Sequence, residues 1–276
     1  MDDVSTREVS LEGFKTDDHK NAFGVWNKMS KKQFKYIFSS FEENKFLLEC
    51  LNSKQIFSIL DYGCATGYLK RYLDLIGGEK INYTGLDLSK KSIEIAKKCY
   101  DTGNFFTGTS TSQLTEKYDL VYSRDVIVHQ TEPWKFISEL ASKTKKNLIL
   151  KLRTRDKGET VLDSEKSCQL QYNEHWLPYI VLNYEEFINH LRKIGFKFIK
   201  INRSYKVAGG QNSRYVEKSL YLKKTGTSET SVFASYENNQ STSTDIVETF
   251  NLEGHDYLDK KKYLTIFYKI LNELGI

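Results

Sequence analysis

The sequence predicts an α/β fold, in which helices cover both faces of a mostly parallel sheet. Apolar segments of strand length alternate with amphipathic helical segments between residues 56 and 152, and this alternation is typical of a parallel sheet. The first strand leads into a turn of small residues, Asp61 to Gly67, which precedes a helix. Two more strands are predicted farther along the chain, at 196–203 and 216–223, and their short connection predicts an antiparallel pair at the sheet edge.

Length and composition exclude several classes of protein. The 276 residues can form one large domain with appendages. No apolar stretch is long enough to span a bilayer, and the acidic N-terminus argues against a signal peptide. Four widely spaced cysteines predict reduced thiols in a cytoplasmic protein, without disulfides and without a metal site. The net charge of +5 is too small to indicate a nucleic-acid partner.

Apolar periodicity defines the elements in chain order. Helical spacing over residues 30–52 predicts one or two amphipathic helices, and residues 1–52 are expected to form an N-terminal helical cap. The main domain is expected over residues 53–224. Its first strands are predicted at 56–60, 82–86, 104–107, 118–122 and 147–152, and its first helices at 67–76, 89–99 and 132–142.

The segment after the fifth strand is expected to cover a substrate. Residues 153–182 form a polar insertion that contains aromatic side chains. A helix is predicted over 184–194 and ends at Gly195. The last two strands are predicted at 196–203 and 216–223.

The C-terminal part is predicted to lie outside the main domain. Residues 225–245 are rich in Thr and Ser and contain no Pro, which predicts a linker or a solvated loop. Residues 256–273 predict an amphipathic helical extension. This helix could pack on the main domain, or form a dimer contact or a lid.

Two acidic residues at strand ends indicate a site for a nucleoside cofactor. Asp61 ends the first strand, and the small residues after it let the backbone approach a ligand closely. The next helix offers free N–H groups at its N-terminus. Asp87 ends the second strand, where a carboxylate can bind a diol. The glycine spacing differs from Gly-x-Gly-x-x-Gly, which disfavours a dinucleotide.

These motifs resemble those of the class I, Rossmann-like S-adenosylmethionine (SAM)-dependent methyltransferases over residues 56–223. Residues 61–67 are similar to the family's motif I, with Ala65 in place of the middle glycine. Residues 83–89, 104–109 and 118–129 are similar to its second, third and fourth motifs. The resemblance implies SAM as cofactor and a seven-stranded sheet, mostly parallel, whose last strand is antiparallel.

The resemblance also implies roles for individual residues. Asp87 would bind the ribose hydroxyls, and Leu88 would pack against adenine. Thr109 stands where the family often has an acid, so the adenine contact is left to the backbone or to Ser110. The cofactor-binding residues implied in this way are Asp61, Gly63, Cys64, Ala65, Gly67, Asp87, Leu88, Thr109, Ser110, Ser123 and Arg124.

Two histidines are candidate general bases. His129 would lie close to the transferred methyl group, and an imidazole can accept a proton near neutral pH. A purely structural role for His129 is the alternative. His175 lies in the insertion with Tyr172 and Trp176. These residues could bind or deprotonate the acceptor, or anchor an apolar lid.

Arg153 and Arg155 follow the fifth strand, at the sheet edge where ligands of such folds bind. They could clamp a phosphate or a carboxylate of the substrate. A solvated basic segment is the alternative.

The sequence thus predicts a SAM-dependent methyltransferase acting on a small molecule. The chain contains no Asn/Asp-Pro-Pro-Tyr/Phe segment, which by analogy with the family favours a hydroxyl oxygen of a sugar, a phosphorylated metabolite or a natural-product intermediate. Methylation of RNA, and a non-catalytic SAM-binding scaffold, are the alternatives. The acceptor could be anionic, no membrane insertion is expected, and a homodimer is left open.

Overall fold

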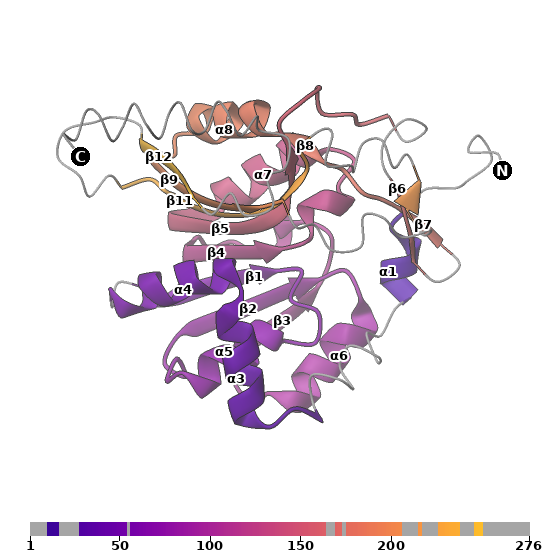
Figure 1. Ribbon diagram of the computed structural model, residues 1–276. Helices are drawn as coiled ribbons and strands as arrows, with labels where there is room; N and C mark the ends of the chain where they lie inside the picture. Colours follow the sequence, from indigo (N-terminus) through magenta and orange to yellow (C-terminus); the bar gives the residue numbers. More distant parts are fainter. Residues whose placement is uncertain are drawn as a thin grey trace, which may run out of the picture.

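The computed structural model describes residues 10–16, 28–53, 56–163, 169–172, 175–205, 215–216, 226–237 and 246–250. A large sheet forms its centre, with the strand order β12-β9-β11-β5-β4-β1-β2-β3, and β8 pairs with β5 (Figure 1). Its strands are β1 (Ser58–Tyr62), β2 (Asn82–Asp87), β3 (Asn104–Thr107), β4 (Tyr118–Arg124), β5 (Thr144–Arg155), β8 (Leu182–Asn183), β9 (Phe198–Ser204), β11 (Ser228–Ser235) and β12 (Ile246–Phe250).

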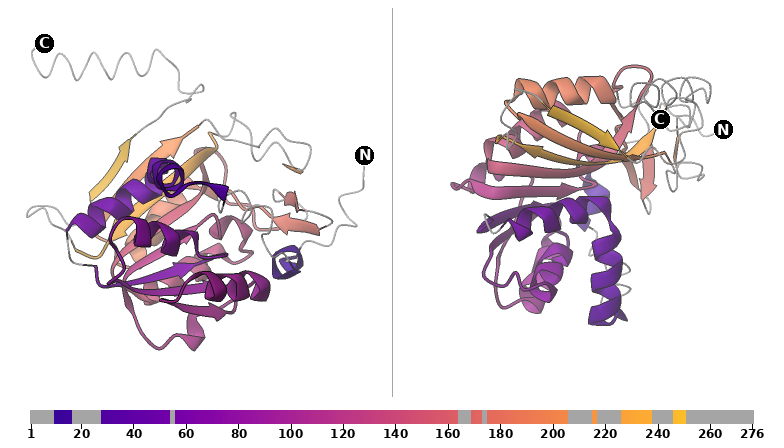
Figure 2. Two further views of the ribbon diagram at one scale, coloured as in Figure 1. Left: turned by 90° about the horizontal axis from the view of Figure 1, so that it is seen from below. Right: turned by 60° about the vertical axis from the view of Figure 1, so that its left-hand side comes forward.

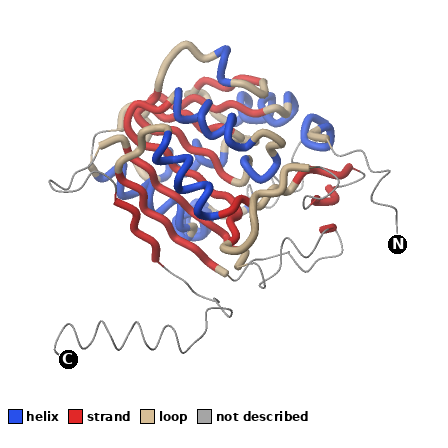
Figure 3. The backbone as a smooth tube through the Cα atoms, turned by 90° about the horizontal axis from the view of Figure 1, so that it is seen from above, coloured by secondary structure: helices blue, strands red, loops and turns tan. Residues whose placement is uncertain are grey.

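Helices cover both faces of this sheet, so the predicted α/β fold is confirmed (Figures 2 and 3). The helices are α1 (Glu12–Thr16), α3 (Lys31–Ser40), α4 (Glu42–Asn52), α5 (Tyr68–Leu75), α6 (Lys90–Cys99), α7 (Pro133–Ser142) and α8 (Tyr184–Lys193), with short 3-10 turns η2 (Thr111–Gln113) and η3 (Ile127–His129).

The central strands are apolar on both faces. β1 lies between β2 and β4 and is parallel to both. Successive side chains of a strand point to opposite faces, so Ile59 and Leu60 enter different cores, and both are fully buried. Leu60 packs in a cluster that includes residues of α7 and α8, and Ile59 packs in one that includes residues of α3 to α6. Burial on both faces is what a central parallel strand requires.

Local capping signals fix several helix starts near their predicted positions. Ser89 precedes α6, and its hydroxyl accepts a hydrogen bond from the backbone N–H of Ser92 (3.2 Å). Asn183 caps α8 in the same way through the N–H of Glu186 (3.0 Å). Each bond satisfies a donor that the helix itself leaves unpaired.

The antiparallel strand lies elsewhere than predicted. β11 is antiparallel to both β5 and β9, so it lies inside the sheet and not at its edge. It spans residues 228–235, where the prediction of a linker over 225–245 is therefore wrong. The Thr230 hydroxyl lies 2.8 Å from that of Thr154, and both side chains are fully buried. Polar residues are tolerated inside a sheet when they are hydrogen-bonded in this way.

Two further strands make this sheet larger than the seven strands predicted. β8 adds a short parallel pairing to β5, and β12 pairs in parallel with β9 at the edge. Of the strand predicted at 216–223, only the first residue lies in a described part of the chain, in β10 (Tyr215–Val216), which pairs with β6 (Gln169–Tyr172) in a separate sheet. The C-terminal helix predicted over 256–273 lies outside the described residues.

A second, three-stranded sheet projects from the domain, with the order β10-β6-β7. It contains the hairpin of β6 and β7 (His175–Pro178) from the predicted insertion. α1 lies against β7, apart from α3 and α4 (Figure 1). The backbone N–H of Ser10 donates to the carbonyl of Trp176 (3.0 Å). The hairpin therefore contacts the N-terminal segment, residues 10–16.

Candidate active site

A cavity of about 390 Å³ opens beside the carboxyl ends of β1, β2 and β4. This is the edge at which parallel α/β sheets bind their ligands. Its volume lies in the range of small-molecule sites. The lining residues are Leu11, Phe14, Phe38, Asp61, Tyr62, Gly63, Cys64, Ala65, Tyr68, Leu69, Asp87, Leu88, Thr109, Tyr122, Arg124, Asp125, Val126, His129 and Gln130.

Two glycines give the turn after β1 its shape. Gly63 has φ +81°, and a Cβ at this position would lie 2.2 Å from Cγ2 of Val126. Gly67 has φ +86°, and its Cβ would lie 2.6 Å from the ring of Tyr100. Both the backbone conformation and the lack of space therefore require glycine. Gly63 lines the cavity, whereas Gly67 lies behind it at the start of α5.

Asp87 connects this turn to the next helix. Its Oδ2 accepts a hydrogen bond from the N–H of Ala65 (2.9 Å), and its Oδ1 accepts one from the N–H of Ser89 (2.8 Å). Ala65 has φ +47°, an uncommon conformation for a residue with a side chain. The carboxylate thus fixes the strained turn and also lies in the cavity wall.

Asp61 lies in the cavity wall in a buried position. The hydroxyl of Tyr83 donates to its Oδ2 (2.7 Å). Burial raises the pKa of Asp61 to about 7; the hydrogen bond from Tyr83 opposes this rise, and the nearby Asp87 adds to it. A bound cation would therefore find a carboxyl group that ionises near neutral pH.

Three of the residues implied in cofactor binding, Thr109, Ser110 and Ser123, differ in position. Thr109 lines the cavity, and its carbonyl accepts a hydrogen bond from the hydroxyl of Tyr62 (2.7 Å). Ser110 does not line the cavity, and its hydroxyl donates to Glu139 (3.0 Å). Ser123, on β4, is buried and is not among the described residues that line the cavity.

His129 lies in the cavity wall, at the end of η3. Its Nδ1 lies 2.8 Å from the carbonyl oxygen of Pro178. A carbonyl only accepts hydrogen bonds, so Nδ1 carries the proton and Nε2 is the unprotonated nitrogen of the neutral ring. Burial lowers the pKa of His129 to about 4, although the bond to Pro178 and the charge of Asp125 oppose this.

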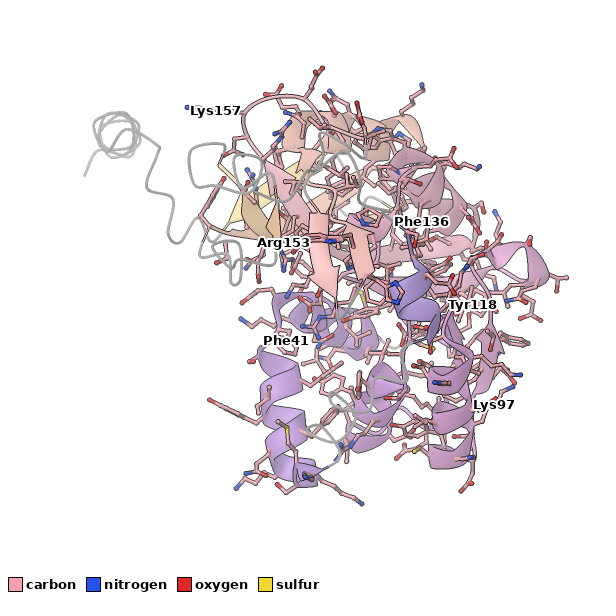
Figure 4. All side chains as sticks on the ribbon, turned by 90° about the vertical axis from the view of Figure 1, so that its right-hand side faces the viewer. Phe41, Lys97, Tyr118, Phe136, Arg153 and Lys157 are labelled. Carbon is pink, nitrogen blue, oxygen red and sulfur yellow. The ribbon has the colours of Figure 1, made fainter. Side chains whose placement is uncertain are left out.

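A network of charged side chains adjoins the cavity. Arg124 Nε lies 2.9 Å from Glu43 Oε1, and its guanidinium stacks on Phe41 at 4.0 Å. Arg153 binds Asp125 Oδ1 (3.1 Å) and Glu229 Oε1 (3.0 Å). Figure 4 labels Phe41 and Arg153. Arg124 and Asp125 line the cavity, and Arg153 does not. Three cations and three anions meet in this network: Arg124, Lys151, Arg153, Glu43, Asp125 and Glu229.

Three other residues of the proposed substrate site, Arg155, His175 and Trp176, lie away from the cavity wall. Arg155 is buried beside Gly158. His175 packs against Gly13 of α1, and Trp176 binds the backbone of Ser10. Tyr172 belongs to β6. Arg155, His175 and Trp176 are not among the described residues that line the cavity.

Several residues of the cavity wall were not predicted from the sequence. Leu11 and Phe14 come from the N-terminal segment, residues 10–16, and Phe38 comes from α3. Asp125 is the residue after β4, and its φ of +56° marks a strained turn. Burial alone would raise the pKa of Asp125, but Arg153, Lys151 and Arg124 hold it below its ordinary value. A spacing of three residues links Leu11 to Phe14, but nothing in it predicts a contact with the domain.

The residues of the cavity fit SAM. Aromatic and aliphatic side chains form much of the wall, as an adenine ring and a thioether chain require. Asp61 and Asp87 supply carboxylates, which suit a ligand that carries positive charge and hydroxyl groups. Among the described residues, no group of three His, Cys, Asp or Glu side chains could hold a metal ion. Within the same residues, every helix is too short or too polar to cross a bilayer.

Curated relatives share part of the chain. A ubiquinone biosynthesis O-methyltransferase of Pelagibacter ubique is 28% identical over 181 residues, which cover 58% of this chain and 73% of the relative. A mitochondrial protein of the same name from Schizosaccharomyces pombe is 31% identical over 120 residues, which cover 40% of this chain and 43% of the relative.

Solved structures share the fold at lower identity. The O-methyltransferase of a polyketide synthase multienzyme of Brevibacillus brevis, in complex with S-adenosyl-L-homocysteine (SAH), matches with a TM-score of 0.53 and 13% identity, covering 83% of this chain and 82% of that one. The cyclase SpnF matches with a TM-score of 0.53 and 15% identity, covering 83% and 97%. Since one match is called a cyclase, the fold alone does not fix the reaction.

A family model decides the membership. The model described as a methyltransferase domain matches residues 27–201, more than half of the chain. This range contains the turn at Gly63, the carboxylate of Asp87 and His129. The chain belongs to the methyltransferase-domain family and is a class I SAM-dependent methyltransferase.

Proposed function

We propose that the protein transfers the methyl group of SAM to a hydroxyl oxygen of a small molecule, with His129 as general base. The observation that carries this proposal is the hydrogen bond from His129 Nδ1 to the carbonyl of Pro178 (2.8 Å). It leaves Nε2 as the basic nitrogen of a residue in the cavity wall. The names of the curated relatives support oxygen as the acceptor atom.

A weak base is sufficient for this reaction. SAM supplies an activated methyl group, and a bond from the acceptor oxygen to that carbon forms as the carbon–sulfur bond breaks. The oxygen becomes strongly acidic as it gains the methyl group, so a base with a pKa of about 4 can take its proton. Asp125 lies near enough to raise the pKa of His129, and so favours the imidazolium that results.

The charges around the cavity favour a neutral acceptor over an anionic one. The wall contains the carboxyl groups of Asp61, Asp87 and Asp125, and Arg124 is paired with Glu43. Arg153, the other candidate for an anion clamp, is bound by two carboxylates. Among the residues that the structure describes, the wall offers no cation that lacks a carboxylate partner, so a phosphate there would lose its hydration without gaining such a cation.

The test measures transfer of labelled methyl groups from SAM to a panel of neutral and phosphorylated hydroxyl compounds. His129→Ala should abolish turnover and leave the affinity for SAM unchanged. His190→Ala is the matched control, because His190 lies outside the cavity wall and bonds Ser138. Unchanged turnover in His129→Ala would refute the role of this residue as base. Preferred methylation of phosphorylated compounds would refute the neutral acceptor.

A further inference from the structure

The aromatic ring of Phe14 packs against the imidazole of His129. The two ring centroids lie 4.7 Å apart with the rings inclined at 67°. Tyr179 contacts the same imidazole, with centroids 5.8 Å apart. Phe14 also lines the cavity, together with Leu11 of the same N-terminal segment. An apolar ring from outside the main domain thus covers the proposed base.

The N-terminal segment depends on β7 for its position. A helix of five residues, as α1 is, does not form alone in water. Its exposed pair of Glu12 and Lys15 contributes little. Ser10 donates its N–H to the carbonyl of Trp176 (3.0 Å). Gly13 packs so closely on His175 that a Cβ there would lie 3.0 Å from the Cβ of His175.

We propose that Phe14, held in place by the contacts between α1 and β7, is a positioning residue that keeps water away from His129. Its catalytic meaning rests on the proposed role of His129 as base. Water at Nε2 would compete with the acceptor hydroxyl for the same lone pair. A dry surrounding also strengthens the hydrogen bond between the acceptor and this nitrogen.

This arrangement gives His175 and Trp176 a function that does not require contact with the substrate. Both residues belong to β7: the side chain of His175 packs against Gly13, and the backbone carbonyl of Trp176 accepts the hydrogen bond from Ser10. The insertion would then act on catalysis through Phe14, because it fixes the segment that carries this ring. The role differs from that of a base, which His175 was predicted to fill as an alternative to His129.

The groups around His129 determine its pKa, which a titration measures. Phe14 and Tyr179 contribute rings, Pro178 contributes a carbonyl, Asp125 raises the pKa of His129, and Arg153 lowers it. Burial is the largest influence, and it holds the pKa at about 4. Removal of the Phe14 ring would admit water and leave the charged groups in place.

The experiment follows the NMR titration of His129, whose signal is identified by its loss in His129→Gln. Phe14→Ala should raise the pKa of His129 by about one unit or more, toward the ordinary value. Phe14→Leu should keep the wild-type value, because an apolar side chain remains. Gly13→Val, which collides with His175, should act like Phe14→Ala. Glu12→Ala is the control on the exposed side of the same helix.

An unchanged pKa in both Phe14→Ala and Gly13→Val would overturn the proposal. The shielding by Phe14 and the role of His129 as base can be tested separately. If the pKa of His129 rises in Phe14→Ala while His129→Gln keeps normal turnover, Phe14 shields His129 but His129 is not the base. If the pKa of His129 is unchanged in Phe14→Ala and in Gly13→Val while His129→Gln has no turnover, His129 remains the proposed base but Phe14 does not shield it.

Discussion

Lowering the pH should weaken the binding of SAM through the titration of Asp61. Burial raises the pKa of this carboxyl to about 7 in the ligand-free protein. SAM carries a sulfonium, an ammonium and one carboxylate, so its net charge is positive. A bound cation stabilises the ionised form of Asp61 and lowers its pKa in the complex. Affinity should therefore be constant above pH 7 and should fall below it, by up to about tenfold per pH unit.

Calorimetry from about pH 5.5 to about pH 8.5 would measure this effect, and buffers of different ionisation enthalpy would count the proton released. Asp61→Asn is the matched control. Its amide oxygen can still accept the hydrogen bond from Tyr83, and the ligand keeps its own ionisation. His129, with a pKa of about 4, does not titrate in this range. Equal pH dependence in the wild type and in Asp61→Asn would refute the reasoning.

The same shift predicts the pH dependence of stability. The pKa of Asp61 rises from 3.8 to about 7 on folding, so this group takes up a proton in the folded state between these values. Its contribution to stability is therefore lost as the pH rises through this window. A shift of about three units corresponds to roughly 4 kcal/mol at most. Asp61→Asn should accordingly raise the free energy of unfolding at pH 8, and the gain should shrink in acid.

Two predictions concern the turn after β1, and both are read from the free energy of unfolding in denaturant. Gly63→Ala should cost about 2–4 kcal/mol, because φ is +81° and the new Cβ meets Val126 at 2.2 Å. Val126→Ala in the same chain should recover the part due to the clash, and no recovery would contradict this contact as the cause. Ala65→Gly should stabilise the fold by up to about 1 kcal/mol, since glycine tolerates a φ of +47°. A loss of stability would contradict strain at Ala65.

Local signals predicted most of the fold. The helix expected over 89–99 is observed as Lys90–Cys99, because Ser89 caps it through a bond to a residue three positions away. β11 was missed for the opposite reason. Its buried hydroxyls are satisfied by a residue 76 positions earlier, as in the contact of Thr230 with Thr154. Composition alone therefore described a solvated segment where the fold contains a strand.

In the candidate site, too, residues placed by local signals were predicted and residues placed by distant contacts were not. Gly63, Ala65 and Asp87 lie in the cavity wall, because two adjacent strands end there and carry these residues to one edge. Phe14 could not be predicted, since its position depends on contacts with β7. Arg153 was expected to follow the fifth strand, but it lies within β5 and outside the cavity wall, and no local pattern reveals that Glu229 binds it from another strand.

Burial shifts the pKa values of Asp61 and His129 in opposite directions, but both shifts favour the uncharged group. It raises the pKa of Asp61 and lowers that of His129, so each is pushed toward its uncharged form. The ligand-free cavity therefore carries less charge near neutral pH than its residues would suggest. Such a site leaves the imidazole free of a proton before the acceptor arrives, and it leaves Asp61 ready to ionise when a cation binds. The cover provided by Phe14 would preserve the first of these properties, and the Tyr83 hydroxyl that bonds Asp61 favours the second. Removing the ring should therefore alter the pKa of His129 and leave that of Asp61 unchanged, because Phe14 contacts the imidazole.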